Sequence, residues 1–317
     1  MKSSHCFIDH LRFAFCALAA ITPIVNAQDL SPLSNYSVIT SGDFSTNSDV
    51  EGRTMVGGNL TGTNSSNFGI RLQGNVPASD LTLRVAGNIS TGNPINVNAG
   101  SIELGGTNTG RMINFNGGGS LVSNPGVNYT SIINQLTSAS QTLAGFQTNS
   151  IQSIPTGQPG PLNFTATPNA NGVAVLLIDG TSLFNNDKVQ QIGITTNGAR
   201  DILINVGGRT LDWQYGNLVG LFTDNAFRDD IVWNFYEATN INFGSRNMMG
   251  QVLAPFADVT TQGNIDGSIF AKSLYTTSEV HLPGYAGTFQ GAIPEPSSAA
   301  FGMAALLLLG IRRKVSV

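Results

Sequence analysis

Gly250-Gln251-Val252-Leu253-Ala254 recurs 17 residues later as Gly267-Ser268-Ile269-Phe270-Ala271, and this repeat is the strongest indication of the fold. A weaker copy, Gly52-Arg53-Thr54-Met55-Val56, lies near the start of the chain. Each copy begins with glycine and continues with residues that favour β-strands. A period of about 17 to 20 residues corresponds to one turn of a β-solenoid, whose turns stack around a continuous core. The repeat therefore predicts a mainly β solenoid. A β-sandwich, which has similar short strands, is the alternative.

Short apolar segments separated by glycine and asparagine continue this pattern through residues 28–290. Both residue types tolerate positive φ and therefore suit tight corners between short strands. Asparagine ladders also fit a solenoid, because equivalent side chains can hydrogen-bond from turn to turn. We expect a single domain over residues 28–290, with strands at residues 55–56, 81–85, 102–104, 113–115, 173–178, 202–206, 231–235 and 241–243.

One segment has helical periodicity instead. Over residues 130–146, apolar side chains recur three or four positions apart, and the opposite side is polar but uncharged. We expect an amphipathic α-helix that packs along the flank of the solenoid, because its apolar stripe must be buried. A helix that binds a partner is the alternative.

The N-terminus has the features of a secretory signal peptide over residues 1–27. Lys2 and Arg12 precede an apolar stretch at residues 13–25, and small residues at Val25 and Ala27 suit signal peptidase. We expect export through the Sec translocon and cleavage between Ala27 and Gln28. A short N-terminal anchor is the alternative, although the apolar run is shorter than a membrane span requires.

Removal of this segment would leave a chain without cysteine. Cys6 and Cys16 are the only two cysteines, so the remaining domain would depend on its core and not on disulfides or a thiolate metal site. Without residues 1–27 and 297–317, five of the 15 basic residues and one of the 19 acidic residues are lost, which leaves a formal charge of −8. An acidic chain with no basic stripe argues against nucleic acid as a partner.

The C-terminal tail, residues 293–317, predicts how the protein is sorted. Pro294-Glu295-Pro296 precedes an apolar run at residues 297–311, and Arg312-Arg313-Lys314 follows it. The apolar run is at the short end for a bilayer-spanning helix, and a basic end of this kind is expected on the cytoplasmic side. A buried C-terminal helix is the alternative, but the two prolines would break a preceding element.

The tail resembles a PEP-CTERM sorting signal, which exosortase processes in Gram-negative bacteria that make exopolysaccharide. The resemblance rests on the Pro-Glu-Pro motif, the apolar run and the basic end, in that order. It implies that exosortase is a partner and that Pro294, Glu295 and Pro296 are its recognition motif. The precursor would be anchored transiently in the inner membrane, and the mature protein would be at the cell surface or extracellular.

The body of the chain resembles the choice-of-anchor A domain of bacterial surface proteins over residues 34–290. The matching segments are residues 49–53, 56–59, 233–238, 250–255 and 263–267. Members of that family end in different anchoring signals, PEP-CTERM tails among them. The resemblance implies surface display with adhesion or matrix association, and it implies no defined chemical activity.

Residues for catalysis or metal binding are sparse. His281, the only histidine after the signal peptide, lies two positions from Glu279, so both would share one face of a strand. We expect a solvent-facing pair, with acid–base chemistry as the alternative. Asp229 and Asp230 are adjacent and would point to opposite faces, which does not indicate a glycosidase pair. They offer calcium ligands together with Asp224 and Asn225, but no EF-hand spacing is present. We therefore predict no catalytic residue, cofactor or metal site.

The sequence also offers two kinds of surface contact. Thr61/Thr63 and Thr107/Thr109 are pairs of the type that suits ice binding on a flat solenoid face, but they do not recur at the turn period. Aromatic side chains could instead stack on sugars, with packing in the core as the alternative. Trp213 and Trp233 are the candidate glycan contacts, and Tyr215 and Tyr236 are further aromatic side chains available for stacking.

These features predict a secreted, exosortase-sorted bacterial surface or extracellular-matrix protein. Its role would be structural or adhesive and not enzymatic. The alternative is a carbohydrate-binding or carbohydrate-active protein that acts on exopolysaccharide.

Overall fold

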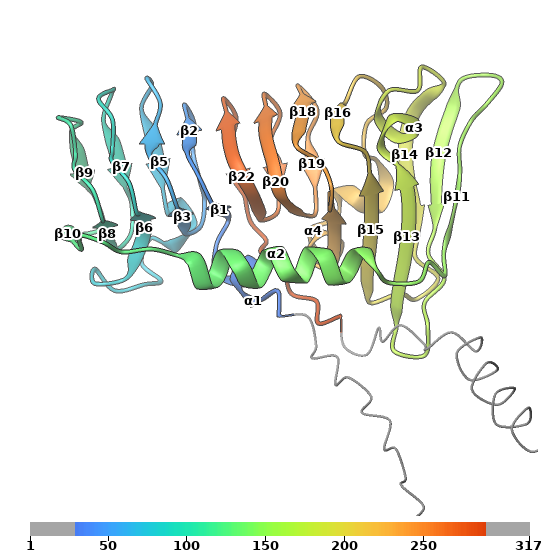
Figure 1. Ribbon diagram of the computed structural model, residues 1–317, viewed down its shortest axis with the longest axis horizontal. Coiled ribbons are helices and arrows are strands. Elements are labelled where there is room, and N and C mark those ends of the chain that lie inside the picture. Colours follow the sequence, from blue (N-terminus) through green and yellow to red (C-terminus); the bar gives the residue numbers. More distant parts are fainter. Residues whose placement is uncertain (1–28, 290–317) are drawn as a thin grey trace, which may run out of the picture.

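The computed structural model of the chain describes residues 29–289 (Figure 1). The predicted signal peptide with its cleavage position and the predicted sorting tail lie outside the described residues. The mainly β prediction is confirmed, because parallel strands dominate the described part of the chain. Within residues 29–289, none of the helices has the length and apolar character needed to cross a membrane.

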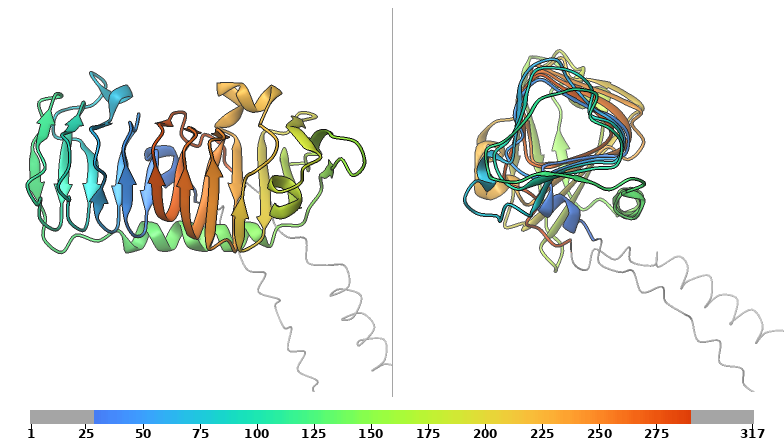
Figure 2. Two further views of the ribbon diagram at one scale, coloured as in Figure 1. Left: turned by 90° about the horizontal axis from the view of Figure 1, so that it is seen from above. Right: turned by 90° about the vertical axis from the view of Figure 1, so that its left-hand side faces the viewer.

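The parallel strands stack in turns that have three faces, and the stack is triangular when viewed from its end (Figure 2). The first face is the longest. Its strands, in order, are β10 (Leu121–Ser123), β8 (Ser101–Leu104), β6 (Leu81–Val85), β3 (Thr54–Val56), β1 (Val38–Thr40), the first part of β22 (Ile269–Thr276), the first part of β20 (Gln251–Thr261), β17 (Ile231–Asn234), β15 (Asp201–Gly207) and β13 (Val173–Asp179).

The other two faces are built from the strands that follow each corner. The second face contains β4 (Leu60–Thr61), β2 (Phe44–Thr46), the second parts of β22 and β20, β18 (Asn240–Gly244) and β16 (Thr210–Asp212). The third face contains β9 (Ile113–Phe115), β7 (Ile95–Val97), β5 (Ser66–Phe68), β23 (Val280–His281), β21 (Ile265–Asp266) and β19 (Met248–Met249). Val50 joins its two groups of strands through bridges to Phe68 and Val280.

Shorter elements complete the described chain. A separate sheet contains β11 (Ile151–Ser153), β12 (Gly160–Thr165) and β14 (Val189–Thr195), and β11 pairs antiparallel with β12. The helices are α1 (Ser31–Asn35), α2 (Thr130–Ala144), α3 (Gly180–Phe184) and α4 (Asn225–Arg228), with 3-10 turns η1 (Ile70–Leu72) and η2 (Gly220–Thr223).

The sequence repeat corresponds to neighbouring turns of the first face. In β20 and β22, Val252 pairs with Ile269 and Leu253 with Phe270, so the two strong copies lie in register. The weaker copy is equivalent too, since Thr54 of β3 aligns with Ile269 through Val38 of β1. Gly267 has a φ of +151°, and a side chain there would clash with the backbone of Gly250. Glycine is therefore required where these two turns approach most closely.

The stacking order does not follow the order of the chain. β1 lies between β3 and β22, so the N-terminal and C-terminal strands meet in the middle of the stack. From this seam, the N-terminal half (residues 38–123) extends to β10 (Figure 1). The segment that includes α2 then carries the chain back along the stack, and the C-terminal half (residues 160–281) returns from the far end to β22.

The predicted amphipathic helix is α2, which ends at Ala144, two residues before the expected boundary. Leu136, Ala139 and Leu143 of α2 are buried against outward-facing side chains of the first face, such as Leu253 and Phe270. Polar contacts accompany this packing: Oγ of Ser140 lies 2.6 Å from Oδ1 of Asn234, and Asn234 donates to Oδ1 of Asn205 (2.8 Å). This buried pair is a short example of the expected asparagine ladder.

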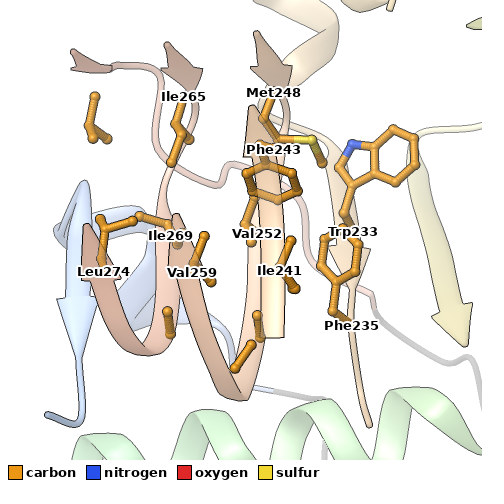
Figure 3. Close-up of a cluster of buried hydrophobic side chains, with 14 of the residues drawn as sticks. Trp233, Phe235, Ile241, Phe243, Met248, Val252, Val259, Ile265, Ile269 and Leu274 are labelled. Carbon is orange, nitrogen blue, oxygen red and sulfur yellow. The ribbon is translucent and has the colours of Figure 1, made fainter. Parts of the chain in front are cut away.

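The main core lies inside the turns. Figure 3 shows side chains from several strands pointing into the stack of the C-terminal half, among them Trp233, Phe235 and Phe243. All three are fully buried. Parallel strands that keep their inward positions aligned therefore give one continuous apolar interior.

Candidate functional site

The second face is a regular polar surface that extends over many turns of the stack. Its strands alternate, so that Phe44, Leu60, Leu274, Val259 and Ile241 point into the core and their neighbours point outward. We call the outward residues of this face the polar face. They are Thr210, Asp212, Asn240, Asn242, Asp258, Thr260, Ser273, Tyr275, Asp43, Ser45, Asn59, Thr61, Asn88, Ser90, Thr107 and Thr109.

A row of small hydroxyl groups crosses the N-terminal half of the polar face. Ser45 aligns with Thr61 in the neighbouring strand. Bridges from Leu60 to Ile89 and from Ile89 to Asn108 bring the next residues, Ser90 and Thr109, into the same row. Neighbouring parallel strands lie about 4.8 Å apart, so these hydroxyl groups repeat at that spacing. The same row continues in the C-terminal half with larger or charged side chains, namely Tyr275, Thr260, Asn242 and Asp212.

A fixed period did not reveal this row because the turns differ in length. The steps from Ser45 to Thr61, to Ser90 and to Thr109 are 16, 29 and 19 residues. The long step contains η1, which lies outside the stacked strands. Threonine therefore does not recur in successive turns, because Ser90 lies between Thr61 and Thr109, but all three hydroxyl groups occupy one row. Their positions could be found only after the η1 insertion was recognised.

Amide groups fix the corner beside this row. Asn59 donates its side-chain and backbone N–H groups to Oδ1 of Asp43 (3.1 and 2.7 Å). Its own Oδ1 accepts the backbone N–H of Asn88 (2.9 Å), and Oδ1 of Asn88 accepts that of Thr107 (2.8 Å). A side chain at Gly58 would clash with Asp43 and with the backbone of Gly42, so glycine permits this close stacking. The ladder holds the edge of the polar face in place.

The third face carries a second set of ladders. Asn114 donates to Oδ1 of Asn96 (2.9 Å), and Asn116 donates to Oδ1 of Asn98 (3.1 Å). Asn67 donates to Oδ1 of Asp49 (2.7 Å), which extends the ladder toward the seam. These amides satisfy one another between turns. In the hydroxyl row of the polar face, Ser90 and Thr109 donate to the backbone carbonyls of Leu60 (3.4 Å) and Ile89 (3.1 Å), and their oxygens can still accept a hydrogen bond.

An ionic cluster lies beside the seam on the third face, within the C-terminal half of the stack. His281 lies between Asp266 (Nδ1···Oδ1, 2.6 Å) and Glu279 (Nε2···Oε2, 2.7 Å), and Arg228 contacts Asp266 (2.7 Å). Burial of His281 opposes its charged form, but its hydrogen bonds with Glu279 and Asp266 outweigh burial and raise its pKa. The predicted Glu279–His281 pair is therefore formed, and both ring nitrogens are engaged with carboxylates. The arrangement fits a structural role, because both ring nitrogens of His281 are engaged and neither is left to act as a base.

The carboxylates considered for calcium are not assembled into a site. Asp224 caps α4 by accepting the backbone N–H of Ala226 (3.0 Å). Burial, and then the charges of Asp229 and Asp201, raise the pKa of Asp230 to about 6. Within residues 29–289, no three His, Cys, Asp or Glu side chains are grouped so that they could hold a metal ion.

Trp213 and Trp233, the candidate glycan contacts, are in the core. Their exposed fractions are 3% and 0%, and their indole N–H groups bond to backbone carbonyls, Trp213 to Tyr215 (2.8 Å) and Trp233 to Met249 (2.9 Å). The expectation that they contact a glycan is therefore wrong for this structure, since neither ring can reach a surface ligand. The aromatic side chain on the polar face is Tyr275, which is 42% exposed. Tyr275 lies in β22, the strand that contains the second repeat. Alternation of inward and outward side chains beyond that repeat could have identified Tyr275 as a surface residue.

Two shallow hollows lie outside the polar face. One, of about 430 Å³, is lined by Thr181, Asn185, Asp187 and Tyr215. The other, of about 460 Å³, lies at the seam and is lined by Glu51, Arg71, Asp229 and Pro283. Neither holds an arrangement of nucleophile, base and orienting group of the kind that catalysis requires.

A parallel β stack with one broad and regular polar face is suited to contact with an extended surface. The family model described as "Putative Ice-binding-like adhesive domain" matches residues 29–282, and the chain belongs to this family. No curated protein and no solved structure matches the chain.

Proposed function

We propose that this β-solenoid is a non-enzymatic adhesive domain that binds a neutral, hydroxyl-rich polymer through its polar face. The observation that carries the proposal is the polar face itself, on which hydroxyl and amide groups occupy aligned positions in every turn from β16 to the turn of Thr109. Membership of an adhesive-domain family supports the same role.

Exopolysaccharide is the polymer class that fits this chemistry best. Hydroxyl and amide groups both donate and accept hydrogen bonds, as sugar hydroxyls do. The exposed ring of Tyr275 adds an apolar face on which a sugar could stack. Since the chain without its signal peptide and tail is acidic, a neutral polymer is favoured over an anionic one.

Ice is less well matched to the polar face than a flexible polymer is. The small hydroxyl row of the N-terminal half is followed by Tyr275, Asn242 and Asp212 in the C-terminal half. Asp258 also forms an ion pair with Lys272 (2.9 Å) at the margin of the face. Bulky and charged groups interrupt a flat, uniform surface, whereas a flexible polymer can accommodate them.

Binding of the purified full chain to exopolysaccharide on a sensor surface tests this proposal. Thr61→Lys and Tyr275→Ala change the polar face and should each lower the amount bound, whereas Gln190→Lys, an exposed change on β14, should not. Equal loss in all three variants, or no loss in the first two, would contradict binding through this face. Adsorption to ice with no binding to any glycan would also contradict the polysaccharide proposal.

The chain's termini support a surface location for this activity. We infer export by the Sec translocon, cleavage between Ala27 and Gln28, and exosortase processing at Pro294-Glu295-Pro296. The resemblance to PEP-CTERM tails and to the choice-of-anchor A domain is the basis of this inference. Residues 297–311 with the basic end at residues 312–314 would hold the precursor in the inner membrane.

Cell fractionation tests the sorting proposal separately. A chain that lacks residues 293–317 should be exported but should no longer be retained or processed at the surface. Alanine at Glu295 alone should reduce processing while residues 297–311 still anchor the precursor. If the truncated chain reached the surface in the same amount as the full chain, sorting by the tail would be wrong.

A further inference from the structure

One end of the stack terminates in two strand edges. In the part of the chain that the structure describes, β10 pairs only with β8 and β9 pairs only with β7. Both strands lie at the same end of the stack, and no other element of residues 29–289 lies beyond them (Figure 1). The outer edge of each strand therefore presents backbone N–H and C=O groups to solvent. We call residues 112–128, which contain β9 and β10, the open end.

The interior of the stack is exposed at the open end. Leu121 has the same inward register as Ile102, yet Leu121 is 42% exposed and Ile102 is fully buried. Ile113 and Phe115 align with the buried Ile95 and Val97 but are only partly buried. Each inward side chain of this last turn has a neighbouring turn on one side only. Solenoids usually cover such a turn with a polar cap, which these exposures show to be incomplete here.

The open end carries no charge. Residues 112–128 contain no Asp, Glu, Lys, Arg or His, although they belong to an acidic chain. Edge strands are usually protected by lysine, proline or a bulge, which prevent pairing with another chain, and β9 and β10 contain neither lysine nor proline. Instead, Met112 and Val122 add apolar surface, with exposed fractions of 64% and 43%.

The opposite end of the first face is closed. β13 is the last strand there, and the backbone N–H of Asn149 donates to the carbonyl oxygen of Val175 (3.2 Å). The side chain of Asn149 accepts the N–H of Val175 (2.8 Å) and donates to the carbonyl of Val173 (3.0 Å). Gln152 donates to the carbonyl of Leu177 (3.2 Å). These bonds occupy the edge groups that an additional strand would need.

We propose that two copies of the chain associate through their open ends as a symmetric, edge-to-edge dimer. A two-fold axis through β10 aligns this strand antiparallel with its own copy, so that donors of the β10 edge meet acceptors of the same edge. The absence of charge in residues 112–128 allows two acidic domains to approach there without like-charge repulsion. A head-to-tail contact with the first face is disfavoured because Asn149 and Gln152 already bond to the outer edge of β13 at its opposite end.

The dimer covers the side chains that the last turn leaves exposed, including Leu121 and Phe115. It also places two polar faces on one elongated particle, which increases avidity for a long polymer without any new contact to it. The association does not depend on what the polar face binds, so the two proposals can fail separately.

Sedimentation velocity of the full chain, kept in solution with a neutral detergent, tests the dimer. From about 1 to 100 µM, the range in which moderate dimers dissociate, the chain should shift from monomer to dimer. Val122→Lys should raise the dissociation constant about tenfold or more, because like charges would meet across the two-fold axis. The lysine is compatible with the folded monomer, since Val122 aligns with Glu103 of β8.

The matched control is Leu177→Lys, which places the same charge on β13 at the closed end, where Leu177 is 50% exposed. This variant should keep the dissociation constant of the unaltered chain. A chain that stays monomeric at the highest concentration, or two variants with equal effects, would overturn the proposal.

Disulfide trapping supplies a second readout that does not require charge. In a chain with Cys6→Ser and Cys16→Ser, we compare Ser123→Cys in β10 with Ser153→Cys in β11, both at exposed serines in terminal strands. A disulfide requires Cα atoms within about 7 Å, so the β10 variant should form a covalent dimer and the β11 variant should not. Equal cross-linking of both variants would show random collision and would reject the symmetric contact.

Discussion

The two halves of the stack build the same three-faced turn with different side chains. The N-terminal half fills its interior with aliphatic residues together with Phe44 and Phe68. The C-terminal half fills its interior with many more aromatic residues. They are Phe164, Phe184, Trp213, Phe222, Trp233, Phe235 and Phe243.

Strand length does not follow this division strictly. β13 and β15 each have seven residues and β1 and β3 each have three, but β17, which carries Trp233, has four, as β8 does in the N-terminal half. Close packing requires that the side chains fill the space that each turn encloses. In the N-terminal half, asparagine ladders and Arg111 also hold the corners of neighbouring turns together. The comparison indicates that one architecture is stabilised by its interior in one half and by its corners in the other.

The strongest test of the aromatic interior is Trp233→Ala. Trp233 is fully buried, packs against Phe164 and Phe222, and bonds to the carbonyl of Met249. We expect a loss of about 3–5 kcal/mol in the free energy of unfolding, from the cavity and the lost transfer energy. Hydrogen exchange should show that protection falls first in the C-terminal half. Equal loss of protection in both halves would mean that they do not behave as separate packing units.

Arg111→Ala tests the corners of the N-terminal half. Arg111 is 2% exposed and donates to the carbonyls of Asn93 (2.7 Å) and Asn64 (2.9 Å), which lie in two other segments of the stack. We expect a loss of about 2–3 kcal/mol in denaturant unfolding, because two part-buried acceptors lose a charged donor. Arg200→Ala is the control, since exposed Arg200 also donates to a backbone carbonyl, that of Asn171. A loss as large in the control would contradict a special role for Arg111.

A smaller effect is expected for one rung of the corner ladder. Asn59→Ala removes the donor to Asp43 and the acceptor for Asn88. Because both partners are near solvent, we expect a loss of about 1 kcal/mol. Thermal unfolding is the measurement, with Asn163→Ala on an exposed position of β12 as control. If Asn59→Ala unfolded at the same temperature as the unaltered chain, the ladder would not contribute measurably to stability.

The smallest expected effect concerns the ionic cluster of His281, which lies beside the seam. The pKa of His281 is raised in the folded chain, so its stabilisation is complete below about pH 6.5 and is lost as pH rises through the folded-state pKa. The free energy of unfolding should therefore decline slightly above pH 6.5, and His281→Gln should remove that part of the slope. If the variant kept the pH profile of the unaltered chain, the ionic cluster of His281 would not contribute to the free energy of unfolding.

Several elements were predictable from local sequence. The glycine-led repeats gave the register of β20, β22 and β3, because strand alternation and the freedom of glycine act over a few residues. The periodicity of residues 130–146 gave α2, since one turn of helix is also a local feature.

The candidate site was only partly predictable. The hydroxyl row was hidden because η1 lengthens one turn and breaks the period. For Trp213 and Trp233 the sequence leaves glycan contact and core packing as alternatives, and their burial in the structure selects core packing. Whether an aromatic ring points into the core or toward solvent depends on how its strand is aligned with the neighbouring strands. That alignment cannot be inferred from the composition of the chain.

The short strands with glycine and asparagine corners and the amphipathic helix follow from the sequence alone, which also predicts terminal segments for export and sorting. The order of the stack, in which Val38 pairs with Ile269 and β10 is left at an open end, follows only from the three-dimensional structure. The difference is one of range along the chain. Strand and helix patterns arise from neighbouring residues, whereas the seam, the polar face and the open end depend on pairings between segments far apart in the chain.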